Sequence, residues 1–126
     1  MNINIERLEK LVLEMHESLP GLLATDIWRN DTGESLAAYN GQPVATKLFN
    51  TLTDELNEAL SASGFPVIGR YYLLELEGDA TTFVIRHRDD LRQGALIDTR
   101  FTTVGTMLAL GLPMALRGVE EARTAG

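Results

Sequence analysis

The sequence contains no cysteine among its 126 residues. This absence excludes disulfide bonds, thiolate metal sites and cysteine nucleophiles together, and it suits a reducing compartment, so we expect a cytoplasmic protein. Histidine is also scarce, because only His16 and His87 occur, and neither lies in a zinc-binding motif. We therefore expect neither a metal nor any other cofactor.

Long apolar runs are missing as well. The longest apolar stretch, Met107 to Leu116, is interrupted by Gly111 and Pro113 and is too short to span a bilayer. The first residues show no basic segment followed by an apolar one, the pattern typical of a secretory signal. Neither membrane insertion nor secretion is expected.

Basic residues are few. Eleven Lys and Arg stand against eighteen Asp and Glu, which gives a formal net charge of −7. The average field therefore repels phosphate backbones. The one basic cluster, Arg86 to Arg88, is followed at once by Asp89 and Asp90 and is too small for a nucleic-acid footprint, so we expect no nucleic-acid partner.

Motifs for catalysis are absent. The sequence has no phosphate-binding G-x-x-x-x-G-K-[ST] loop, no G-x-G-x-x-G after a strand, and no G-x-S-x-G around any of its serines. His87 to Leu91 superficially resembles the catalytic loop of protein kinases, but nothing else of a kinase accompanies it, and Asp residues are typical of turns. We expect no catalytic residue and no enzymatic activity.

Turn-forming residues divide the first half of the chain into clear segments. Apolar residues at helical spacing from Ile5 to Leu19 predict an amphipathic helix, which Pro20 and Gly21 end. An extended segment, Leu22 to Arg29, leads to a predicted hairpin turn at residues 30–33, and Glu34 to Tyr39 form the return strand.

A second helix is predicted from Pro43 to Ser63, with Gly64 ending it. One side of this helix is an apolar ridge, widened by Phe49, whose main residues are Val44, Leu48, Leu52, Leu56 and Leu60. The other side is polar and on balance acidic. We expect it to meet water or a polar partner surface, which makes it the candidate partner-binding surface: Lys47, Asn50, Thr51, Asp54, Glu55 and Glu58.

Three strands in an antiparallel meander follow, predicted at Val67 to Glu77, Ala80 to His87 and Leu91 to Asp98. The first carries consecutive large residues at 71–74, so we expect both of its faces to be covered and helices to lie on both sides of the sheet. A last helix is predicted from Thr103 to about Ala122, kinked at Pro113. The chain is expected to be one domain, 1–126, with a disordered small-residue tail at 124–126.

The order of these elements resembles a roadblock (dynein light chain) domain. The likeness covers almost the whole chain, and the residues that carry it are the junction Leu19 to Leu22, the turn Asp31 to Gly33, the segment Gly94 to Ile97, and Gly105 early in the last helix. It implies an α/β (α+β) fold of the roadblock and profilin-like sandwich type. The expected sheet has five mostly antiparallel strands in the order 2-1-5-4-3, with the first and last helices on one face and the second helix on the other.

In this arrangement the strand Val67 to Glu77 is an edge. It lacks the lysines or the mid-strand proline that protect an edge in a monomer. The resemblance implies that two copies pair these strands and bring their second helices together, so we expect a homodimer with an interface that includes Phe49, Leu52, Tyr71, Leu73 and Glu75.

The function implied by the resemblance is that of a non-enzymatic dimeric adaptor or regulator that binds a partner protein, with a small Ras-like GTPase ranked first. The alternative is a small-ligand sensor with a profilin-like pocket between sheet and helix, to which Arg70, Tyr71 and Tyr72 supply polar groups. A divergent hydrolase ranks third, because the sequence offers no matching constellation of ionisable residues.

Overall fold

The computed structural model describes residues 2–125, with side chains up to residue 123. The predicted order of helices and strands is confirmed. The elements are α1 (Ile5–Ser18), β1 (Leu22–Arg29), β2 (Ser35–Tyr39), α2 (Pro43–Ala62), β3 (Tyr71–Leu76), β4 (Ala80–His87), β5 (Leu91–Asp98), α3 (Val104–Thr106), η1 (Met107–Gly111) and α4 (Leu112–Ala125).

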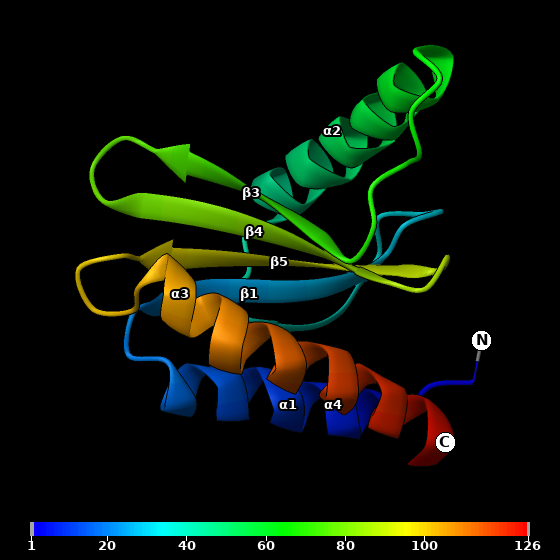
Figure 1. Cartoon of the computed structure of the whole chain (residues 1–126). Helices are drawn as coiled ribbons and strands as arrows, with labels where there is room; N and C mark the ends of the chain where they lie inside the picture. The colour runs from blue at the N-terminus through cyan, green and yellow to red at the C-terminus, as the bar shows by residue number, and fades with distance from the viewer. Residues whose placement is uncertain (1, 126) are drawn as a thin grey trace.

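The five strands form one antiparallel sheet in the order β2-β1-β5-β4-β3, as the resemblance predicted. Helices α1 and α4 lie side by side on one face, and α2 lies obliquely on the other face (Figure 1). The far end of α2 extends away from the sheet beyond β3. Two helices therefore cover one face of the sheet, whereas a single oblique helix lies on the other.

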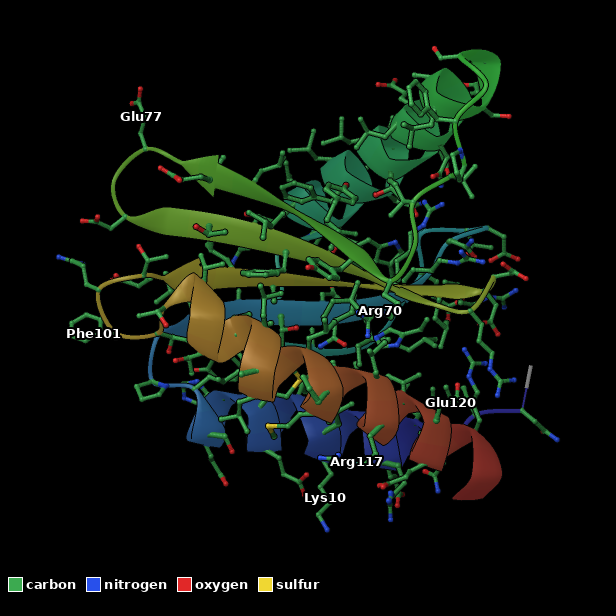
Figure 2. The ribbon with its side chains drawn as sticks, in the orientation of Figure 1. Lys10, Arg70, Glu77, Phe101, Arg117 and Glu120 are labelled. Atoms are coloured by element: carbon green, nitrogen blue, oxygen red, sulfur yellow. The ribbon has the colours of Figure 1, made fainter. Side chains whose placement is uncertain are left out.

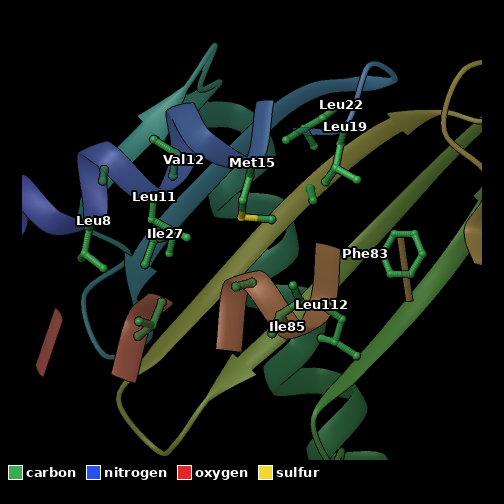
Figure 3. Close-up of a cluster of buried hydrophobic side chains, with 14 of the residues drawn as sticks. Leu8, Leu11, Val12, Met15, Leu19, Leu22, Ile27, Phe83, Ile85 and Leu112 are labelled. Carbon is green, nitrogen blue, oxygen red and sulfur yellow. The ribbon is translucent and has the colours of Figure 1, made fainter. Parts of the chain in front are cut away.

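The hydrophobic core lies between the sheet and the α1 and α4 layer. Residues of α1 at helical spacing pack against alternate residues of the strands, because the buried side of a strand recurs every second residue (Figure 3). At Gly118 of α4 a side chain would collide with Leu11 of α1, so glycine permits the close approach of the two helices. The main fully buried members of this core are Leu8, Met15, Leu19, Leu22, Ile27, Phe83, Ile85 and Met107.

The junction after α1 is fixed by another close contact. A side chain at Gly21 would come within 2.5 Å of the Asp98 carbonyl oxygen. Its N–H donates to the Thr102 hydroxyl at 2.7 Å, and its carbonyl accepts from the Asp98 N–H at 2.8 Å. The Leu-Pro-Gly junction thus ties the start of β1 to the end of β5 and the start of the last helical segment.

The last helix is not uniform. The single helix predicted from Thr103 to Ala122 is divided into α3, η1 and α4, where η1 is a π-helical turn. The N–H of Leu112 donates to the Met107 carbonyl five residues earlier, and Pro113 follows directly. A wider turn at this point accommodates the hydrogen bond that Pro113 cannot make. The irregularity therefore precedes the proline. Residues 124 and 125 belong to α4, and Gly126, the end of the predicted tail, lies outside the described residues.

Strand β3 begins at Tyr71 and not, as predicted, at Val67. The backbone groups of Ile68 are bonded to side chains instead of to a strand: its N–H donates to the Asn57 side chain at 3.0 Å, and its carbonyl accepts from Arg86 at 3.3 Å. Pro66 has no N–H to donate. The segment from α2 to β3 is consequently a loop.

A series of hydrogen-bonded polar side chains crosses the core beneath β4 and β5. His87 is only 3% exposed, and its Nε2 lies 2.9 Å from the Gln93 side-chain oxygen. Because the Gln93 amide nitrogen donates to the Thr25 hydroxyl, that oxygen is left to accept, which fixes His87 as the donor. Burial disfavours the charged imidazolium and lowers the pKa of His87 to about 4, so the imidazole is neutral at pH 7.

This pKa predicts a loss of stability that begins near pH 6.5, above the range in which carboxylates titrate. The unfolded chain binds a proton at His87 near pH 6.5, whereas the folded chain does so near pH 4, so stability is complete above that window and falls as the pH drops through it. Urea unfolding should show a loss of about 2 to 3 kcal/mol between pH 7 and pH 4.5. A His87→Gln variant, which keeps a donor but does not titrate, should lose much less, and an equal loss in both proteins contradicts the assignment.

Candidate functional site

Helix α2 is held on the sheet by polar side chains. The Thr46 hydroxyl donates to one oxygen of Asp26 at 2.6 Å, and the Ser35 hydroxyl donates to the other oxygen at 2.6 Å. Asp26 is nearly buried, and both of its oxygens are hydrogen-bonded. A carboxylate with this degree of burial needs such partners, so the first turn of α2 is fixed over β1 and β2.

Asn50 is the centre of the attachment. Its side-chain oxygen accepts from the indole N–H of Trp28 at 2.9 Å and from Arg92 at 2.8 Å, and Arg92 also donates to the Asn50 carbonyl at 3.0 Å. The second guanidinium nitrogen of Arg92 donates to Asp54 at 2.8 Å. Arg92 is 8% exposed, so its charge depends on these acceptors.

The attachment continues toward β3. The Thr53 hydroxyl lies 2.8 Å from the Tyr72 hydroxyl, and one of the two donates to the other. Burial raises the pKa of Tyr72, which keeps the phenol protonated and able to take part in this bond. Thr46, Asn50, Thr53 and Asn57 are spaced three or four residues apart, so one side of α2 faces the sheet and this side is polar.

The orientation of α2 adds contacts that the sequence did not predict. The polar side was expected to meet water or a partner, and Asn50 and Asp54 are in addition bonded to the protein's own sheet. Lys47, Thr51, Asp54, Glu55 and Glu58 are exposed. Four of the six predicted partner-binding residues, Lys47, Asn50, Thr51 and Asp54, line a polar groove of about 680 Å³ between α2 and the β1 and β2 hairpin.

The apolar ridge of α2 is left on the opposite flank of the helix. Val44 is 83% exposed and Leu48 56% exposed, while Phe49 and Leu52 are half-buried. A second groove, of about 300 Å³, lies beside this flank. Its lining is largely apolar and comes from α2 and from four strands: Ala45, Leu48, Phe49, Trp28, Leu76, Ala95 and Leu96 among others.

Both faces of β3 are covered by helices, as predicted. Tyr72 contacts α2, and since side chains alternate along a strand, Leu74 and Leu76 lie on the same face. Tyr71 and Leu73 pack instead against the core on the α1 and α4 side. The predicted interface residue Phe49 therefore shares a face with Leu76, and not with Tyr71 or Leu73. Glu75 is exposed.

The outer edge of β3 is open, since β4 is its only partner among the described residues. The Arg70 carbonyl accepts from the Arg86 N–H at 2.8 Å, so the backbone groups of residue 70 point toward β4. In an antiparallel pair this direction alternates, so the N–H and C=O groups of Tyr71, Leu73 and Glu75 point away from the sheet. These three predicted interface residues thus present free backbone donors and acceptors.

The described residues show no group of three or more His, Asp or Glu side chains that could hold a metal ion. None of the helices within residues 2–125 is long and apolar enough to cross a membrane. The arrangement of α2 and β3 offers apolar surface, free backbone groups and a polar groove, which are features of an association surface.

Comparison with known proteins shows the fold. No protein-family model and no curated protein matches the sequence. Among solved structures, Myxococcus xanthus MglB matches 94% of this chain and 91% of its own with 8% identity and a TM-score of 0.75. A structure described as MglB with tetrameric arrangement matches equal shares with 14% identity and a TM-score of 0.75. A Roadblock/LC7 domain from Streptomyces avermitilis matches 90% of this chain and 94% of its own, with 16% identity and a TM-score of 0.64.

The predicted fold class, a roadblock and profilin-like sandwich, is therefore confirmed, and the chain has a roadblock-like fold. At these identities the likeness extends to the fold alone.

Asn50 provides a test of how α2 is held. Asn50→Ala removes the acceptor of a buried indole N–H and of a nearly buried guanidinium, and we expect the free energy of unfolding to fall by about 3 kcal/mol. Emission from Trp28, the sole tryptophan, should change in the folded variant. Thr51→Ala, at the exposed neighbouring position, should stay within about 0.5 kcal/mol of the parent. Equal effects of the two substitutions in urea unfolding contradict this account.

Proposed function

We propose that this protein is a non-enzymatic homodimeric adaptor or regulator that binds a partner protein, with a small Ras-like GTPase as the first partner to test. The observation that carries the proposal is that an exposed apolar groove and an unpaired strand edge lie on the same side of the molecule. Leu76 of β3 and Phe49 of α2 line the same groove, next to the edge strand whose backbone groups are free.

Self-association pairs the strand edge and covers the apolar flank of α2 at once. Pairing two β3 edges gives the outward N–H and C=O groups of Tyr71, Leu73 and Glu75 backbone partners, and it removes the hazard of an open edge. The same two-fold operation brings the apolar flanks of the two α2 helices toward each other. The tetrameric arrangement described for one MglB structure supports self-association in this fold.

Partner binding is assigned to the polar groove between α2 and the β1 and β2 hairpin. Lys47 and Thr51 lie there, and Glu55 and Glu58 extend the polar surface along the helix. The groove itself is on the flank of α2 opposite to the apolar one, so it stays open in the proposed dimer. The choice of a GTPase as partner rests on the resemblance to the roadblock family.

The apolar groove also supports the alternative, a sensor for a small ligand, since its volume of about 300 Å³ is at the lower end of the range for ligand pockets. Arg70, Tyr71 and Tyr72, which were expected to supply polar groups, do not line it, and Asp26 and Thr46 at its border bond to each other. A thermal-shift screen with metabolites separates the two functions, because a sensor is stabilised by one ligand class.

The dimer has a direct test. Multi-angle light scattering at micromolar concentration should return twice 13.9 kDa for the parent chain. Phe49→Asp places a charge in the proposed contact between the helices and should shift the mass toward the monomer. Lys47→Asp, two residues away on the opposite flank, should remain dimeric. Far-UV circular dichroism checks that both variants are folded, and a parent mass near 13.9 kDa contradicts the proposal.

Partner binding is tested with purified Ras-like GTPases from the same cell, each loaded with GDP or with a non-hydrolysable GTP analogue. We expect one of them to bind the dimer in calorimetry, and Glu55→Lys with Glu58→Lys should weaken that binding at least tenfold without changing the dimer mass. Glu9→Lys with Glu17→Lys on α1 makes the same change of charge on the other face and should bind normally. Unchanged affinity of the first variant excludes the polar flank of α2.

A further inference from the structure

The charges along β3 are arranged with opposite signs at its two ends. Arg70 precedes the strand, while Glu75 and Glu77 lie at its far end, and Figure 2 shows Arg70 and Glu77 at opposite ends of β3. All three side chains are exposed. Within the described part of the chain, none of the three has a salt bridge or a side-chain hydrogen bond, although most other arginines do. An antiparallel copy of this strand brings each charge close to its opposite.

The free edge restricts how two copies can pair. Outward-pointing backbone groups occur at Tyr71, Leu73 and Glu75, so these residues must lie opposite outward-pointing residues of the second copy. In a two-fold antiparallel pair, one residue then lies opposite its own copy. The candidates for this central residue are residues 71–75.

Two of these alignments bring the Glu75 carboxylates of the two copies close together. With Glu75 at the centre, the two Glu75 side chains are directly opposite each other. With Leu74 at the centre, each Glu75 lies opposite Leu73 of the partner subunit, and the two carboxylates are diagonal neighbours on the same face. Like charges opposite each other destabilise a strand pair, and diagonal neighbours about 7 to 8 Å apart are still within reach of long side chains.

Two other alignments move the pairing out of the strand. With Tyr71 or Tyr72 at the centre, residues 73–75 lie opposite residues 67–71, most of which belong to the loop before β3. Ile68 in this loop already has both backbone groups bonded to side chains. With Tyr71 at the centre, Leu76 lies opposite Pro66, which cannot donate.

We propose that the two β3 strands pair with Leu73 lying opposite its own copy, and that Arg70 of each copy lies between Glu75 and Glu77 of the other. In this alignment Tyr71 pairs with Glu75 and Tyr72 with Leu74, so all five residues belong to β3. Arg70 lies opposite Leu76 of the partner subunit, between the two carboxylates along that strand. It is at the bend before β3 and lines a hollow with Leu116 and Glu120, so it is on the α1 and α4 side of the sheet. Glu75 points to the same side, because alternate residues of β3 such as Leu73 pack there. The inference rests on the proposed homodimer and adds its register.

The absence of cysteine in the sequence allows a clean test of the register. Tyr72→Cys, Leu73→Cys and Leu74→Cys are made singly in the full chain and oxidised with glutathione at micromolar protein concentration. A residue opposite its own copy has a Cα separation of about 5.5 Å, inside the range for a disulfide, while a diagonal pair is near or beyond its limit. Leu73→Cys should therefore cross-link at least tenfold faster than the other two, as judged on non-reducing gels.

The charges are tested by reversal. Arg70→Glu places three carboxylates together at each end of the pair and should weaken the dimer about tenfold in sedimentation equilibrium. Adding Glu75→Arg and Glu77→Arg should restore the affinity to within about threefold of the parent, which a merely structural role of Arg70 does not predict. Arg117→Glu, an exposed site on α4 with no salt bridge among the described residues, is the matched control and should not change the affinity.

The outcomes separate this inference from the proposed function. Faster cross-linking of Tyr72→Cys or Leu74→Cys in a dimeric protein overturns the register and leaves the homodimer intact. Failure of the triple reversal to restore affinity overturns the role of Arg70. A parent chain of monomeric mass overturns the homodimer and the register with it.

Discussion

The structure depends on the hydrogen bonds that Asn50 accepts from Trp28 and Arg92. Arg92 is nearly buried, and its guanidinium has to keep its acceptors because an unpaired charge at that depth costs several kcal/mol. Asn50 and Asp54 are both on α2, so this requirement fixes the rotation of the helix about its own axis. Once the rotation is fixed, Thr46, Asn50, Thr53 and Asn57 face the sheet, and the apolar flank with Leu48 and Phe49 lies beside the apolar groove.

The α2 side of the sheet is built for this arrangement. At Gly94 a side chain would lie 3.2 Å from the Trp28 ring, so the small residue makes room for the indole that donates to Asn50. On the opposite face, Phe83 and Ile97 fill the space under α1 and α4. The sheet therefore has one face that packs in the hydrophobic core under α1 and α4, and this face stabilises the fold. The other face has grooves on both sides of α2. Association surfaces in the proposed dimer come from the second face and from the edge of β3.

Much of the fold was predictable, because turn residues such as Pro20, Gly21 and Gly78 separate segments with clear helical or alternating patterns. The orientation of α2 was not predictable in the same way. Periodicity divides a helix into sides, but the side that faces the sheet depends on partners such as Arg92, which is 42 residues from Asn50 in sequence. The same limitation applies to β3, where four consecutive large residues give no alternation to distinguish the faces. The edge position of β3 was predicted through the resemblance and is confirmed, whereas the role of Asn50 was not predicted, and Phe49 as an interface residue stays a prediction.

Net charge alone would argue against self-association, since each chain carries −7. Exposed charges further apart than about 8 Å are largely screened at physiological ionic strength, so the charges next to the edge decide the outcome. Along that edge Arg70 precedes the strand and Glu75 follows its middle, so an antiparallel copy is attracted at both ends. A parallel copy would place Arg70 beside its own copy and Glu75 beside its own. A foreign strand has to match the same order of charges. The pattern thus favours the chain's own copy over other strands, and it does so without a more favourable net charge.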